Sequence, residues 1–285
     1  MQKGQLLAGA IAIGVVGALF FWGNTKPPQK NTPAPTAVSA EAGHAHDAAE
    51  AITFEELLAS AKAKLSSEQN TTLTGIEQQV KRGDVQDQQM HTYHALARKW
   101  EDFKDFPVAA YYHAEAAKLE NSEKTLTFAG NLFLTLLSKT EDVRVRKWEA
   151  LQAIDCFQKA IDLNPDNDTL KIALASCYIE GTGETMQGVQ LLLGVTRSNP
   201  DNVPANLILG RMAVQSGQFD KAIKRLEELL SKHPDNSEAM YFIAEAYKGQ
   251  GQTDKAVEWF EKCKKKVNNP DFSKEIDNYI ATFKH

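Results

Sequence analysis

Cysteine is scarce in this sequence and forms no recognisable motif. The three cysteines, Cys156, Cys177 and Cys263, are far apart and make no CxxC pair, so neither a zinc cage nor a thioredoxin-type site is predicted. Each lies within an apolar helical pattern, where a free cysteine packs as a small hydrophobic side chain. A disulfide between Cys156 and Cys177 is an alternative if their helices touch in an oxidising compartment.

Positive charge is also in short supply. The chain has 32 Lys and Arg against 37 Asp and Glu, a net charge of −5. A nucleic-acid partner would require clustered basic side chains that neutralise phosphates. The densest basic run, residues 262–266, lies near the end of a predicted helix, where cations suit the negative end of the helix dipole. The sequence therefore predicts no nucleic-acid partner.

Catalytic motifs are missing as well. The sequence contains no GxSxG, no HExxH, no P-loop and no GxGxxG after a strand. His91 and His94 share one helix face with Arg98, but no cysteine or third histidine is near them in the sequence. Two histidines and an aspartate in residues 44–47 lie in a segment without preorganised geometry. We therefore predict no catalytic residues, no metal and no cofactor, and we predict that the protein is not an enzyme.

Proline and glycine are not abundant either. The chain has 10 prolines and 17 glycines, and 42% of its residues are hydrophobic. This composition argues against a mostly disordered chain and allows a sizeable core. A length of 285 residues is enough for one or two ordinary domains.

A long uncharged hydrophobic run is present at the N-terminus, in residues 4–23. At about 1.5 Å per residue, a helix of this length is roughly 30 Å long, which matches the hydrocarbon core of a membrane. Trp22 lies at its end, where an aromatic ring suits the interface. The run ends in aromatic residues rather than in the small residues of a cleavage site, which favours an uncleaved anchor over a signal peptide. Residues 1–23 are therefore predicted to form a transmembrane signal-anchor helix.

The orientation of this anchor rests on weaker signals. One lysine precedes the run and two lysines follow it closely, so the flanking charges are nearly balanced. The short polar tail before the run is typical of a bacterial signal anchor, which predicts a single-pass inner-membrane protein with a periplasmic soluble part. Ala10, Gly14 and Ala18 form a line of small residues that could pair two anchors in a homodimer.

Residues 24–51 change in character. Four prolines occur there among Ala, Thr and Ser, without apolar periodicity, which predicts a flexible linker. In residues 52–89, apolar side chains at Phe54, Leu57, Leu58 and Ala61 follow helical spacing and predict one or two helices. This segment could cap the following structure, form a separate helical hairpin or belong to an assembly surface.

An internal period runs through the rest of the chain. Pro165, Pro200 and Pro234 end three similar copies and are spaced by 35 and 34 residues, and a fourth copy stops at Asn268. The second half of each copy carries apolar or small residues at spacings of four and three, which places them on one helix face. Examples are Ala153, Phe157 and Ala160, and then Ala256, Phe260 and Cys263.

The first half of each copy carries a small residue, for example Gly130, Gly210 and Ala244, and in most copies an aromatic residue follows one turn later, as Tyr247 follows Ala244. The small residue would allow two helices to approach closely, and the aromatic ring would fill the space between them. Taken together, these positions resemble the tetratricopeptide repeat, a helical hairpin of about 34 residues with the signature Trp, Leu-Gly, Tyr, Ala, Phe, Ala, Pro. The likeness extends to bacterial single-span periplasmic members of that family.

The resemblance covers five copies in residues 90–268. The first copy has His113 where the family prefers Phe, and we interpret His113 as a packing residue. The second carries about eleven extra residues before Ala153, which we expect to lengthen its first helix and the turn around residues 140–146. The resemblance implies an all-α superhelix of stacked hairpins, with residues 269–285 as a C-terminal capping helix.

Members of this family bind peptides or partner helices in a groove formed by the first helices. Mapping that face onto this chain gives His94, Arg98, Thr127, Asn131, Ser176, Leu207, Arg211, Tyr241, Glu245 and Lys248. The mixture is polar with scattered apolar anchors, which suits contact with a peptide. The resemblance implies a membrane-tethered scaffold or adaptor for a protein or peptide partner in the bacterial cell envelope.

Two other functions fit the same layout. The protein could be a structural subunit of a permanent envelope complex, of the secretion or cytochrome-maturation type. It could also be an import-type receptor that faces the cytosol.

Overall fold

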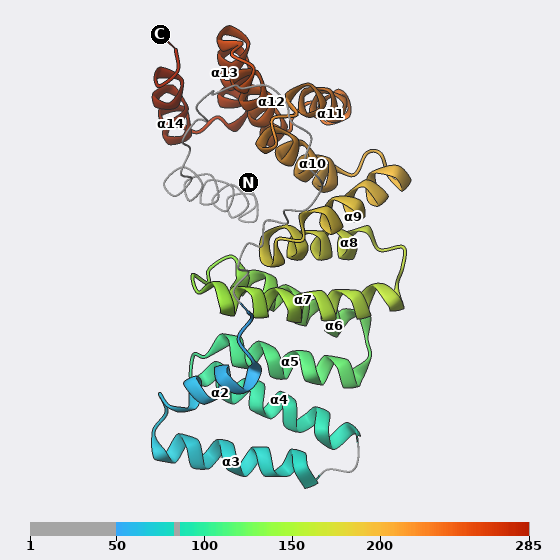
Figure 1. Cartoon of the computed structure of the whole chain (residues 1–285), viewed down its shortest axis with the longest axis vertical. Helices are drawn as coiled ribbons and strands as arrows, with labels where there is room; N and C mark the ends of the chain where they lie inside the picture. Colours follow the sequence, from blue (N-terminus) through green and yellow to red (C-terminus); the bar gives the residue numbers. More distant parts are fainter. Residues whose placement is uncertain (1–49, 83–85, 285) are drawn as a thin grey trace, which may run out of the picture. The chain divides into compact units, whose positions relative to one another are not determined.

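The computed structural model describes residues 50–82 and 86–284, and within these ranges the chain forms helices and no strands (Figure 1). The all-α prediction is confirmed for these residues. The predicted anchor in residues 4–23, its line of small residues and the linker up to residue 49, including residues 44–47, lie outside the described residues. No helix in residues 50–82 or 86–284 is long and apolar enough to cross a membrane.

Ten helices form five consecutive hairpins in two layers, and each helix packs on the next one along the chain. The front layer holds the first helix of each hairpin: α4 (Gln86–Asp102), α6 (Glu123–Leu137), α8 (Asp168–Ser176), α10 (Val203–Gln215) and α12 (Ser237–Gly249). The back layer holds the second: α5 (Phe106–Glu120), α7 (Val143–Leu163), α9 (Thr185–Ser198), α11 (Phe219–Lys232) and α13 (Thr253–Val267). Each of the five predicted copies therefore coincides with one hairpin.

The start of each of the last three hairpins is encoded in a Pro-Asp-Asn turn. In three copies the asparagine is the N-cap of the next front-layer helix: Asn167, Asn202 and Asn236. The side-chain oxygen of Asn202 accepts a hydrogen bond from the backbone N–H of Ala205 at 3.1 Å. Such a cap satisfies one of the free N–H groups at a helix start. The repeat period in the sequence thus predicts where these helices start as well as which of their faces are apolar.

Small residues bring the two helices of a hairpin together, as the sequence predicted. A Cβ placed on Gly210 of α10 would lie 2.6 Å from Cδ2 of Leu226 on α11. A Cβ placed on Gly130 of α6 would lie 2.8 Å from the ring of Phe157 on α7. Both distances are shorter than a contact between two carbon atoms allows, so the close packing of the two helices requires glycine at these positions.

The extra residues of the second copy lengthen its second helix, so the expectation of a longer first helix is wrong. Front-layer helix α6 ends at Leu137, whereas α7 begins at Val143, ten residues before Ala153. Asp142 starts α7 early because its carboxylate accepts hydrogen bonds from two backbone N–H groups of the first turn. The added turns then bury Trp148 and Ala150 against their neighbours.

Residues 50–82 continue the stack at its N-terminal end. Helices α2 (Phe54–Lys62) and α3 (Ser67–Arg82) place Ala61 and Leu73 in one buried cluster with Trp100 of α4. This arrangement matches the capping role among the three alternatives. Glu50 and Ala51, assigned to the linker from sequence, are part of the packed structure, because Ala51 contacts the core and the Glu50 carbonyl accepts a hydrogen bond from Arg144.

The C-terminal helix α14 (Pro270–Ala281) ends the row. It buries Ile276 and Ile280, whereas Asp271, Lys274 and Asp277 stay exposed. A helix with one apolar and one polar face closes an open stack in this way.

The basic run in residues 262–266 is engaged in ion pairs. Lys262 pairs with Glu258 at 2.8 Å, and Lys264 pairs with Glu261 at 2.9 Å and with Asp277. These pairs lie within α13 or reach α14, which agrees with the structural interpretation of the run.

The three cysteines are free and buried, so the Cys156–Cys177 disulfide is not formed. Burial raises the pKa of each thiol to about 12. A thiol with such a pKa stays protonated near neutral pH and is a poor nucleophile.

Candidate partner-binding surface

The front-layer helices carry all ten residues of the predicted groove. They lie on α4 (His94, Arg98), α6 (Thr127, Asn131), α8 (Ser176), α10 (Leu207, Arg211) and α12 (Tyr241, Glu245, Lys248). Members on one helix are three or four residues apart and so share a face. We call the side of the front layer turned away from the back layer the front face.

At the N-terminal end of the front layer, histidines meet an aromatic ring. The rings of His94 and His113 have centroids 6.2 Å apart, and Nε2 of His113 lies 2.9 Å from a carboxylate oxygen of Glu101. Burial lowers the pKa of His94, and the neighbouring His113 lowers it further. His113 is mostly enclosed, which agrees with its interpretation as a packing residue. Phe128 contacts the ring of His113 edge-on at 5.7 Å.

Phe128 was not among the residues selected from sequence. Its side chain is 52% exposed, so an aromatic ring faces solvent here. It lies three residues before Asn131 on α6, and residues three apart share a helix face, so the helix register could have placed it beside the predicted groove.

Arg98 is exposed, and it makes no hydrogen bond or ion pair with any residue that the structure describes. It borders a cleft of about 500 Å³ between α3 and α4. The floor of this cleft includes Ile76 and Ala95, and its rim carries Lys99 and Asp102, which pair with each other at 3.1 Å. Arg98 is therefore free to bind a group from outside.

Arg211, in the middle of the front layer, is held by carboxylates of this chain. One of its guanidinium nitrogens lies 3.1 Å from a carboxylate oxygen of Glu180. Its charge also acts on Glu238, whose pKa is raised by burial and lowered in part by Arg211. Unlike Arg98, Arg211 already has a partner in the free protein.

The position of Glu180 depends on a short π-helix, η1 (Cys177–Thr182), that follows α8. The guanidinium of Arg146 on α7 donates a hydrogen bond to the Glu180 carbonyl at 3.1 Å. A Cβ on Gly181 would overlap the Cβ of Ala150, so only glycine fits against α7 there. The long α7 thus supports the turn that brings Glu180 to Arg211, a relation hidden from sequence except for the irregular Gly181-Thr182-Gly183.

At the C-terminal end, α14 covers the front face of α12. The ammonium of Lys248 lies 4.3 Å from the ring centroid of Tyr279, at cation–π distance, and it also contacts the Tyr279 hydroxyl. Burial raises the pKa of Glu245, and a hydrogen bond with Tyr279 opposes that rise. Tyr241 packs against Phe260 with centroids 5.4 Å apart. The open part of the front face therefore runs from α4 to α10.

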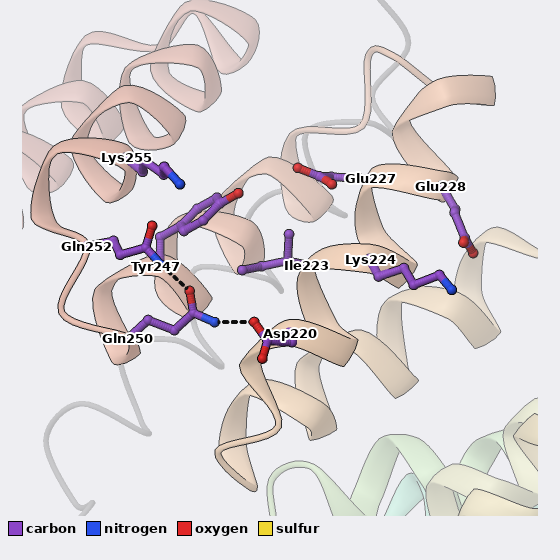
Figure 2. A pocket seen from close by; sticks show the side chains of 9 residues that line it. All are labelled: Asp220, Ile223, Lys224, Glu227, Glu228, Tyr247, Gln250, Gln252 and Lys255. Atoms are coloured by element: carbon purple, nitrogen blue, oxygen red, sulfur yellow. Dashed lines mark hydrogen bonds between the residues drawn. The ribbon is translucent and has the colours of Figure 1, made fainter.

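A second cleft, of about 390 Å³, lies between α11 and the α12–α13 turn (Figure 2). Gln250 donates a hydrogen bond to Asp220 at 2.7 Å and accepts one from Gln252 at 2.7 Å, which ties the two hairpins together. Lys255 lies 5.1 Å from the ring centroid of Tyr247. Ile223 and the exposed charged side chains of Lys224, Glu227 and Glu228 complete the lining of this cleft, and no sequence motif marks it.

One family model matches part of this chain. Residues 213–273 match the family model for the tetratricopeptide repeat. The matched segment runs from the end of α10 into α14 and contains the whole last hairpin. No curated protein matches the chain.

Several solved structures are similar over most of their own length. MamA is 23% identical, with 63% of this chain and 92% of that chain covered and a TM-score of 0.48. YrrB, described as a TPR protein with an unusual peptide-binding site, is 17% identical, with 72% and 97% covered and a TM-score of 0.46. TTC0263, a thermophilic TPR protein of Thermus thermophilus, is 18% identical, with 68% and 98% covered and a TM-score of 0.47.

Proposed function

We propose that this protein is a scaffold that binds a protein or peptide partner along the front face from α4 to α10. The observation that carries the proposal is a row of side chains turned away from the core and left without side-chain partners in the described residues. Arg98, Thr127 and Asn131 belong to this row, and Phe128 adds an exposed aromatic ring. Aromatic and arginine side chains of this kind supply much of the binding energy at protein interfaces.

We assign no catalytic role to this surface. The cysteine thiols are buried with pKa values of about 12, and the described residues contain no group of three side chains placed to hold a metal ion. These features favour a binding surface over an active site.

We expect loss of the partner when the exposed aromatic ring is removed from the front face. Full-length chain would be cross-linked in cells, and captured proteins identified and quantified. Phe128→Ala, alone and with Arg98→Ala, should lower capture of the specific partner at least about tenfold, the equivalent of roughly 1.4 kcal/mol. Leu151→Ala on α7 is the matched control, because Leu151 is also exposed, at 41%, but lies in the back layer.

Equal capture by the Phe128 and Leu151 variants would refute the front face as the binding surface. The same experiment separates an adaptor from a subunit of a permanent complex. An adaptor exchanges its partner and releases it at high salt, whereas a permanent complex keeps a constant stoichiometry.

The proposal further places the repeats on the outer side of a bacterial inner membrane, tethered by residues 4–23. The charge-free run in that segment and its aromatic end support this placement. Protease added to intact spheroplasts should then degrade the repeats while the chain stays in the membrane fraction after carbonate extraction. Protection of the repeats would instead favour the cytosol-facing receptor, and release by carbonate would refute the anchor.

A further inference from the structure

We propose that residues 50–57, here called the strap, are a releasable cover over a second peptide-binding site on the back layer. This site takes an aromatic side chain together with a nearby carboxylate. Its components are Tyr111 and Tyr112 on α5 and Trp148 and Arg144 on α7, here called the socket. The proposal is independent of the front face, since the strap's aromatic contacts and its hydrogen bonds to other helices reach α5 and α7.

The strap is seated in the socket as a peptide ligand would be. The ring of Phe54 stacks on Tyr111 with centroids 3.5 Å apart and planes 16° apart. It also meets Tyr112 edge-on at 5.7 Å and lies parallel to Trp148 at 6.3 Å. Three aromatic rings from two helices thus contact one phenylalanine. Aromatic pairs of this kind add to the binding energy beyond the contribution of the buried area.

Arg144 supplies the polar half of the socket. Its guanidinium donates hydrogen bonds to the Glu50 carbonyl and to the Glu56 carboxylate, each at 3.2 Å. Its own carbonyl accepts a hydrogen bond from the backbone N–H of Ile52 at 3.3 Å. One residue of α7 therefore binds the strap backbone and its acidic side chain, which is how a peptide with a carboxylate two positions after its aromatic residue would be recognised.

The strap is held weakly enough to be exchanged. Ala51, Ile52, Phe54 and Leu57 are only partly buried, and both members of the Glu56–Arg144 pair are about half exposed. Exposed ion pairs of this kind add little to stability. The Phe54 ring makes three aromatic contacts but is itself only partly buried, so it can leave the socket while the buried core residues stay packed.

The rest of α2 has its own attachment, so release of the strap need not unfold the cap. Ala61 is buried, and Lys62 pairs with Glu77 on α3 at 2.7 Å. The side chain of Asn70 donates a hydrogen bond to the Lys62 carbonyl at 3.2 Å. The first turn of α2 can therefore detach while its last turn stays on α3.

The socket is also preformed without the strap. Trp148 is buried and packs edge-on against Phe133 of α6 at 5.6 Å. Tyr112 is buried and lies 6.1 Å from the ring of Tyr93 on α4. These contacts do not involve the strap, and they fix the positions of Trp148 and Tyr112. An aromatic side chain of a partner would therefore find the socket already formed.

The strap is then an intramolecular competitor. A ligand in trans binds only the fraction of molecules whose socket is open, which raises its apparent dissociation constant. The occupant in trans is a partner segment with the chemistry of the strap itself, an aromatic residue followed by a carboxylate at the start of a helix.

The test uses a fluorescent peptide that copies residues 48–60 and the full-length chain in detergent. The peptide should bind the Phe54→Ala chain at least about tenfold more tightly than the wild-type chain, because Phe54→Ala vacates the socket. The same peptide with alanine at the Phe54 position should not bind detectably to either chain. Adding Arg144→Glu to the Phe54→Ala chain should weaken binding again.

Equal binding of the peptide to wild-type and Phe54→Ala chains would overturn the proposal, as would equal binding of the two peptides. Circular dichroism of each variant tests whether its helices are still folded. If Phe54→Ala proves unfolded, Phe54→Leu keeps an apolar side chain at this position but loses the stacking on Tyr111, so it weakens the strap and should also raise peptide affinity. Wild-type self-association through the strap would be seen as dimers that Phe54→Ala abolishes, and it would make a second copy, not another protein, the occupant.

Discussion

Phe157→Ala should lower the free energy of unfolding by about 3–5 kcal/mol, the usual cost of removing a large aromatic side chain from a core. The Phe157 ring is fully buried in the largest apolar cluster, which joins α5, α6, α7 and α8. It lies against Gly130, where a missing Cβ lets α6 approach α7. Its loss leaves a cavity that neither helix can close, because each is also packed against the neighbouring hairpin.

Urea denaturation of the purified chain, followed by circular dichroism, measures this effect. Phe128→Ala is the matched control, since it removes the same ring from the same hairpin at an exposed position. That variant should lose less than about 1 kcal/mol. Because arrays of repeats can unfold in more than one step, the comparison should use the transition that both variants share. Similar losses in the two variants would contradict the assignment of Phe157 to the core of the hairpin.

Phe157 also illustrates what could be predicted from sequence. Its spacing from Ala153 and Ala160, repeated in later copies, placed it on a buried helix face, and the structure buries all three. The small residue that accommodates it, Gly130, was predicted from the same period. Residue spacing within one copy is enough to predict such positions, because every hairpin packs against its nearest neighbours in the same way.

Contacts that are not repeated could not be predicted in this way. The strap reaches α5 and α7 across about ninety residues of sequence, from Ile52 to Arg144, and no periodic signal marks such a pairing. The extra residues of the second copy extended α7 instead of α6, because the Asp142 cap and the burial of Trp148 favour an earlier start of the second helix. Both features lie outside the repeat pattern.

The ten residues predicted to line the groove lie on front-layer helices, and their role in binding stays a prediction. Arg98 and Asn131 are exposed, whereas Lys248 contacts Tyr279 of α14 and Tyr241 packs against Phe260 of α13 in its own hairpin. Sequence periodicity identifies which residues share a helix face. It does not reveal whether a terminal helix, which follows a different pattern, covers that face.

The second large effect expected is a dependence of stability on pH that comes from Glu149. This residue is fully buried at the start of the long α7, where one carboxylate oxygen accepts a hydrogen bond from the Thr140 hydroxyl at 3.0 Å and the other has no partner in the described residues. Burial raises the pKa of Glu149 from 4.5 to about 7, although Thr140 and Arg146 oppose the rise.

Between about pH 4.5 and pH 7, the folded chain keeps this proton while the unfolded chain releases it. The unfolded state therefore binds fewer protons, and stability falls as pH rises through this window, by roughly 3 kcal/mol in total. Glu149→Gln keeps the shape without the charge, so it should remove this slope and be more stable than wild type at pH 8 by about 2 kcal/mol. Urea denaturation at pH 5, 6, 7 and 8 measures the slope, with the exposed Glu141→Gln as control. If the wild-type and Glu149→Gln stability curves ran parallel across these values, the buried carboxyl would not be the group that titrates, and the long α7 would tolerate a charge at its start.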